Sequence, residues 1–116
     1  MKIKAGELIQ AVEAASKMMQ DRMPLRAASW LVLFIKRMEP AYQLVIERRN
    51  DLIRKYSEEG KNSVAPALIP KYLEEVEPLL KEEVEVDVIK VEMSIFDNVQ
   101  ISPSTLMSLD LFLTKE

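Results

Sequence analysis

The feature that most constrains the fold is a long helical repeat of apolar side chains that continues through a proline. Between residues 25 and 58, apolar side chains recur every three or four positions, which is the spacing of one face of an α-helix. They are Leu31, Ile35, Met38, Tyr42, Val45, Leu52 and Tyr56, with Arg49 at the position of the repeat between Val45 and Leu52. The repeat keeps its phase across Pro40, and the adjacent Glu39 and Ala41 favour helices. We therefore predict one kinked helix over 25–58.

Patterns on either side of this helix predict the remaining elements. In chain order they are an edge strand at 2–4, a helix over about 5–20, a loop over 59–68, a helix over about 70–82, a strand over about 84–93, a short strand over 99–101 and a helix over about 103–113. The first helix must stop before Pro24, because the residue before a proline avoids the helical conformation. Ser102 followed by Pro103 is a typical start for the last helix.

Together these elements predict a single-domain α+β fold that is mainly helical. We expect the long kinked helix to form an antiparallel helix hairpin with the first helix. A small β-sheet built from the N-terminal strand and the 83–101 segment should lie beside them, and the C-terminal helix should close the core. At 116 residues the chain has the typical length of one domain.

The residue inventory argues against most enzymatic chemistry. The chain has no cysteine and no histidine, which excludes disulfides, thiolate or imidazole metal sites, cysteine nucleophiles and Ser-His-Asp triads. We therefore expect a non-enzymatic protein with no catalytic residue, no cofactor and no metal site. The longest apolar run, 30–35, is far shorter than the ~20 residues of a membrane span, and the N-terminus lacks a hydrophobic signal core. The expected location is the cytosol.

A cluster of carboxylates is the one set of side chains that offers oxygen ligands. Its members are Glu74, Glu75, Glu77, Glu82, Glu83, Glu85 and Asp87. Carboxylates of this kind hold Mg²⁺ or Ca²⁺, and a pair of them can perform acid–base chemistry. No EF-hand loop and no HExxH-like spacing fixes their geometry, however. We interpret them as the solvated faces of a helix and a strand.

The segment WLVLFI, residues 30–35, is apolar around the whole circumference of the predicted helix. Such a segment should be buried on more than one side, which is more than a single neighbouring helix covers. We therefore predict a partner-binding surface for self-association, as a homodimer or higher, or for another protein. Its residues are Trp30, Leu31, Phe34, Ile35 and Met38.

A basic group in the same helix favours a different partner, nucleic acid. Arg48, Arg49, Arg54 and Lys55 could follow phosphates, which would make the protein a small regulator. Interleaved acidic residues such as Asp51 and the low pI of about 5.1 argue against it. Arg49 also falls on the apolar seam, so either the seam is open there or a carboxylate faces the guanidinium.

The charge is divided unevenly along the chain. Residues 1–60 carry eleven Lys and Arg against eight Asp and Glu, and residues 61–116 carry five against eleven. Two interpretations fit this division: the two halves pack with complementary surfaces, or one face meets a charged partner.

The order of these segments resembles a group of small uncharacterised proteins of tailed bacteriophages and prophages. The resemblance covers nearly the whole chain and lies in KIK, MPLRAASWLV, RRNDLIRKYSEEG, VEVDVIKVEM and ISPSTLMSLDLFL. Pro40 and Pro78 depart from that pattern. The resemblance implies a phage origin, a location in the cytoplasm of a bacterial host cell and an accessory role, without any residue-level function to carry over.

Overall fold

The computed structural model describes residues 1–57, 63–87, 90–97 and 99–114, and within them the chain forms four α-helices. They are α1 (Ala5–Met18), α2 (Leu25–Lys55), α3 (Ile69–Lys81) and α4 (Pro103–Leu109). Short 3-10 helices occupy Pro66–Leu68 (η1), Met93–Phe96 (η2) and Asp110–Phe112 (η3). Together with two small sheets they confirm the prediction of a mainly helical α+β fold.

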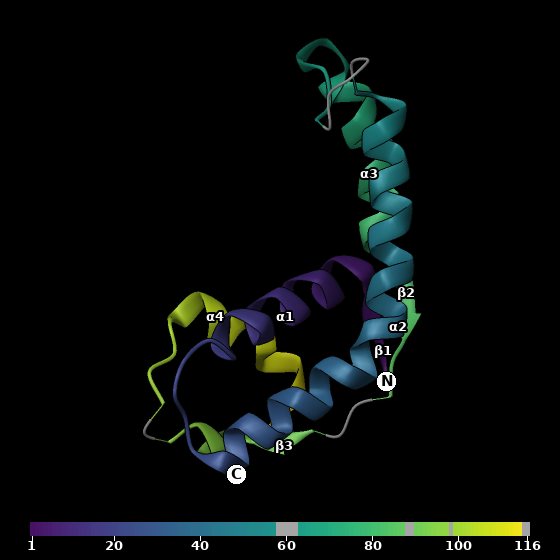
Figure 1. The fold of residues 1–116 in the computed structure, drawn as a ribbon. Coiled ribbons are helices and arrows are strands. Elements are labelled where there is room, and N and C mark those ends of the chain that lie inside the picture. The colour runs from purple at the N-terminus through teal and green to yellow at the C-terminus, as the bar shows by residue number, and fades with distance from the viewer. Residues whose placement is uncertain (58–62, 88–89, 98, 115–116) are drawn as a thin grey trace.

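α2 runs without interruption from Leu25 to Lys55, so the prediction of one helix through Pro40 is confirmed. Figure 1 shows this helix bending near its middle. A proline in a helix interior removes one hydrogen bond and crowds the preceding turn, which bends the helix. The first half of α2 therefore packs beside α1, as predicted, while the second half leaves the body of the molecule beside α3. The predicted end of this helix, residue 58, lies outside the described residues.

Two small sheets join segments that are far apart in the sequence. β1 (Lys2–Lys4) pairs antiparallel with β2 (Glu83–Glu85), and β3 (Val91–Glu92) pairs parallel with β4 (Leu113–Thr114). In the first sheet Ile3 lies opposite Val84. Ile3 is buried between two exposed lysines, because alternate side chains of a strand point to opposite faces. The edge strand predicted at 2–4 is therefore present, with Ile3 turned toward the core.

Three predicted elements near the C-terminus need correction. The strand predicted over 84–93 forms only as β2 and β3, and its middle residues 88–89 lie outside the described residues. The strand predicted over 99–101 is wrong, since this stretch is irregular. The last helix ends at Leu109 instead of 113, because the backbone tightens into η3 and then extends so that Leu113 pairs with Val91.

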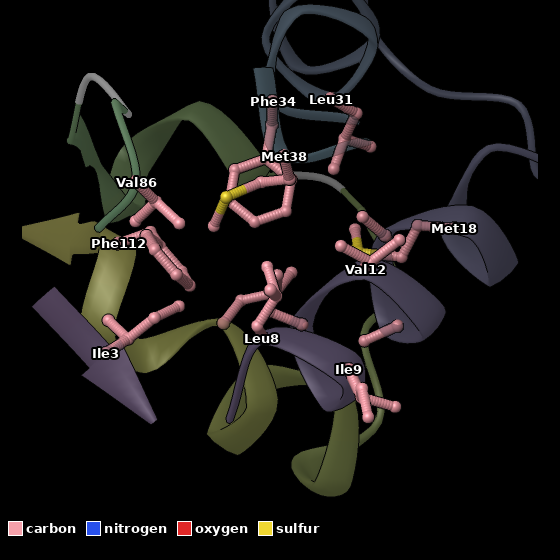
Figure 2. Close-up of a cluster of buried hydrophobic side chains, with 14 of the residues drawn as sticks. Ile3, Leu8, Ile9, Val12, Met18, Leu31, Phe34, Met38, Val86 and Phe112 are labelled. Atoms are coloured by element: carbon pink, nitrogen blue, oxygen red, sulfur yellow. The ribbon is translucent and has the colours of Figure 1, made fainter. Parts of the chain in front are cut away.

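The core of the body lies between α1, the first half of α2 and the C-terminal segment. The largest fully buried side chains come from these elements: Leu8, Leu31, Met38, Leu109 and Phe112. Figure 2 labels four of them, Leu8, Leu31, Met38 and Phe112, which point into a common interior with Ile3 and Val86 at its edge. Burying each such side chain contributes about 1.5–3 kcal/mol. This cluster therefore fixes the first half of α2 onto α1.

The second half of α2, residues 41–55, and α3 project from this body as a two-helix hairpin, called the arm below (Figure 1). The projection makes the molecule 47 Å long but only 27 and 22 Å across. At the base of the arm, α1 approaches α3 closely at Gly6. A Cβ atom placed on Gly6 would lie 3.3 Å from the carbonyl oxygen of Leu80. The small residue thus lets the two helices meet, and α1 covers only the base of the arm.

Candidate protein-binding surface

The structure places the predicted partner-binding residues in the core of the single chain. Trp30, Leu31, Phe34 and Met38 are all buried, and Ile35 is half-buried against the same cluster. The Trp30 and Phe34 rings stack with centroids 5.0 Å apart, and Phe34 meets Phe112 edge-on at 4.9 Å. These residues therefore pack inside the single chain, where Phe112, from the far end of the sequence, contacts Phe34 of α2.

The uncovered side chains of WLVLFI are Val32 and Leu33, which the all-round apolar pattern had predicted to be buried. They are 37% and 40% exposed, because they lie on the side of this half of α2 that faces away from the core. Leu25, seven residues before Val32 and therefore on the same face of the helix, is 81% exposed. The outward face of the first half of α2 thus carries large apolar side chains in contact with solvent.

Cations surround these apolar side chains. Residues 22–38 contain four basic residues and no acidic one. Among the described residues, no carboxylate lies within ion-pair distance of Arg26 or Lys36, while Arg37 has only Asp87 at 3.9 Å. Below, this surface is called the basic face, and it consists of Leu25, Arg26, Val32, Leu33, Lys36 and Arg37.

One side of the arm is charged and joined by ion pairs. Arg48 of α2 donates a hydrogen bond to Glu82, just after α3, over 2.8 Å, and Lys55 lies 3.0 Å from Glu75. The hydrogen bond from Lys55 holds the pKa of the Glu75 carboxyl below its ordinary value, and the Tyr56 hydroxyl adds to this effect. The same hydrogen bond raises the pKa of Lys55. These interactions link α2 to α3 along this side.

The opposite side of the arm is apolar and only partly covered. On α3, Leu73 precedes Glu75 by two residues, which in a helix turns it about 200° away from the ion-paired side. Leu73 is 52% exposed, and Ile69, one turn earlier, is 42% exposed. On α2, Ile53 is half-buried on the same side. α1 covers this side at Leu80 but not at Leu73 and Ile69, which lie farther along the arm.

The arm has a thin core of its own. Of the apolar side chains on α3, only Val76 and Leu79 are buried, and neither belongs to the main cluster in the body. On the facing half of α2, Val45 is buried but Leu52 is only half-buried, as is Tyr56 just after the helix. Two helices cover only the stripes that face each other, so a two-helix hairpin leaves apolar flanks in contact with water. The arm therefore has apolar surface that a further helix would bury.

Arg49 lies on the apolar side of the arm, one residue and about 100° from the ion-paired Arg48. Its side chain is half-buried, and its Nε is buried with no hydrogen-bond acceptor. The sequence left two explanations open: the seam is open at Arg49, or a carboxylate faces its guanidinium. Within the described part of the chain, no facing carboxylate is observed. Leaving such a donor unsatisfied costs about 1–3 kcal/mol.

The four cations predicted to contact nucleic acid do not form one free basic face. Arg48 and Lys55 are paired with carboxylates across the arm, and Arg54 is paired with Asp51 on its own helix. Arg49 points to a different side. Phosphate contacts would have to compete with three existing ion pairs.

Two hollows lie beside the arm. One, of about 590 Å³, opens on the charged side and is lined by Arg48, Leu52, Glu75 and Leu79 among others. The second, of about 430 Å³, lies at the bend of α2 and is lined by Pro40, Leu44 and the acidic residues that precede and form β2. Within residues 1–57, 63–87, 90–97 and 99–114, no three His, Cys, Asp or Glu side chains gather to hold a metal ion. The helices in those same ranges include none long and apolar enough to cross a membrane.

The sequence predicted the helix over about 70–82 but not the exposed apolar surface at Ile69 and Leu73. A signal was present, because the stripe on α3 is broader than one facing helix can cover. Nothing in the sequence showed that α1 would leave the arm at its base.

Comparison with protein-family models, with curated proteins and with solved structures finds no match to this chain. The resemblance to phage proteins therefore rests on the sequence pattern alone.

Proposed function

We propose that this protein is a non-enzymatic, phage-type accessory protein that acts in the bacterial cytoplasm by binding protein through its arm. The observation that carries the proposal is the apolar side of the arm, where Ile69 and Leu73 remain 42% and 52% exposed on a helix that projects away from the core. Burying apolar surface of this kind is the dominant favourable contribution to most protein–protein associations. A protein helix laid along this side would complete a three-helix packing.

The alternative function, nucleic-acid regulation through Arg48, Arg49, Arg54 and Lys55, gains no support from this geometry. Three of these cations already face carboxylates, which lowers the net positive charge that phosphates would meet.

The test is co-purification of protein partners with a tagged chain, in which Leu73→Asp is compared with the unmodified protein. Met107→Asp is the matched control, because Met107 is another large side chain that is 77% exposed, on α4 in the body. Both substitutions put one carboxylate on an exposed helix position, so both variants should keep their circular dichroism spectrum and melting temperature.

We expect Leu73→Asp to lose the bound protein and Met107→Asp to retain it. Loss with both variants, or retention with both, would remove the arm from the proposed function.

A further inference from the structure

We infer that the partner of the arm is a second copy of this chain, whose basic face packs against the exposed face of α3. This inference rests on the proposed function, because it names the occupant of the same surface. The exposed face of α3, called the arm face below, consists of Ile69, Leu73, Glu74 and Glu77.

The arm face has an apolar centre with an acidic edge. Ile69, Leu73 and Glu77 follow one another at intervals of four residues, so they line one face of α3. Glu74 lies beside them and has no ion-pair partner among the described residues, and Glu77 has only Lys81 of its own helix, at 3.6 Å. Both carboxylates therefore remain in solvent at the edge of an exposed apolar stripe.

The basic face has the complementary composition. Leu25 and Val32 are exposed at an interval of seven residues, and Leu33 lies beside Val32. Arg26 and Lys36 flank these side chains, and no carboxylate in the described part of the chain lies within ion-pair distance of either, although Glu39 follows Lys36 by one turn. An apolar stripe edged with cations fits an apolar stripe edged with carboxylates, since the apolar parts are buried while the charges pair at the rim.

The two faces do not meet within one chain. The basic face lies on the first half of α2 in the body, whereas the arm face lies on α3 beyond the bend of α2 (Figure 1). In a pair of copies related by a two-fold axis, each basic face would meet the arm face of its partner, so the contact would form twice. Residues 1–60 carry an excess of cations and residues 61–116 an excess of carboxylates. Contacts between the two copies would then balance these charges, together with the ion pairs inside the arm.

The test is the molar mass in solution, measured by light scattering on two charge-reversed proteins. In the first, Arg26→Glu and Lys36→Glu reverse the basic face, and in the second, Glu74→Lys and Glu77→Lys reverse the arm face. All four side chains are exposed, so both variants should fold, which circular dichroism checks. If a double variant unfolds, a single substitution on the same face replaces it: Leu33→Asp for the basic face, or Leu73→Asp for the arm face.

We expect the unmodified protein to have about twice the 13.3 kDa mass of one chain and each charge-reversed protein to have the mass of one chain. Each reversal should weaken association by at least about tenfold, because like charges then face each other. An equimolar mixture of the two should regain the double mass, since both contacts become attractive again. In about 1 M salt the unmodified protein should dissociate more readily, because charges are then screened beyond about 3 Å.

An unmodified protein that stays at the mass of one chain at every concentration would overturn the inference. The inference would also be overturned if each charge-reversed protein still formed a dimer by itself, or if the mixture of the two did not form one. The proposed function would survive a single-chain mass if Leu73→Asp still abolished capture of a different protein, so the two failures are distinguishable.

Discussion

Lys55 Nζ lies 3.0 Å from Oε1 of Glu75, which joins the end of α2 to the middle of α3 on the charged side of the arm. The two residues are twenty positions apart in the sequence. Together with the Arg48–Glu82 pair it gives the arm one side fixed by charge, opposite the side that remains open.

This ion pair gives the arm a dependence on pH at both ends of the scale. The pKa of Glu75 is lowered from its ordinary value of 4.5, mainly by the hydrogen bond from Lys55. Its contribution to stability is therefore complete above 4.5 and lost as the pH falls through the lowered pKa. The pKa of Lys55 is raised from 10.5, so its contribution is complete below 10.5 and lost as the pH rises through the raised pKa.

Replacing Lys55 by Met should return the pKa of Glu75 toward 4.5, because the main cause of its shift is removed. The measurement is a carboxyl-carbon NMR titration of Glu75 in both proteins, with the exposed Glu74 as internal control. An unchanged pKa for Glu75 would mean that the pair does not form in solution.

The ring contact between Phe34 and Phe112 predicts that the C-terminal segment is essential for stability. Phe112→Ala should lower the free energy of unfolding by about 3–5 kcal/mol, because a fully buried aromatic side chain is removed from the core. Leu111→Ala, at the exposed neighbouring position, is the control and should change it by less than about 1 kcal/mol. Urea denaturation followed by Trp30 fluorescence measures both, and equal effects would contradict the packing.

The close approach of α1 to α3 predicts a size limit at residue 6. Gly6→Val should destabilise the protein by about 1–3 kcal/mol, since its side chain would collide with the Leu80 backbone at the base of the arm. Gly6→Ala adds only the tight Cβ contact at 3.3 Å and gains helix propensity, so its effect should be much smaller. Thermal denaturation compares the two, and a Val variant as stable as the original would show that the helices are not held this close.

The start of α4 offers a test of a cap that the sequence predicted. Ser102 Oγ accepts a hydrogen bond from the backbone N–H of Thr105 at 3.3 Å, ahead of Pro103. Ser102→Ala should cost about 0.5–2 kcal/mol, whereas Ser102→Asp should preserve most of the stability because aspartate also caps helices. Similar losses for both would indicate that the cap contributes nothing.

The sequence predicted local structure better than it predicted which surfaces are covered. The unbroken apolar phase across Pro40 identified α2 correctly, because a kinked helix keeps its periodicity. Ser102 and the alternation at Ile3 were likewise readable from local chemistry. The strand at 99–101 and the length of the last helix were wrong, because pairing between Val91 and Leu113 depends on segments that meet only in the folded chain.

The candidate site shows the same limit. The apolar segment around Trp30 correctly indicated that α2 needs cover on more than one side. The sequence could not show that Phe112 and Phe96 would supply it, since those contacts span sixty or more residues. The exposed apolar surface consequently lies at Leu25, Val32 and Leu33, on the opposite face of α2 from the buried residues first selected, and on α3.

The most direct measurement is disulfide cross-linking between two single-cysteine variants, which the absence of native cysteine makes unambiguous. Leu33→Cys marks the basic face and Leu73→Cys marks the arm face. If the basic face of one copy packs on the arm face of another, mild oxidation of a mixture should give mostly the mixed disulfide, and each variant alone should stay uncross-linked. A product distribution no richer in the mixed disulfide than random pairing gives would contradict the account.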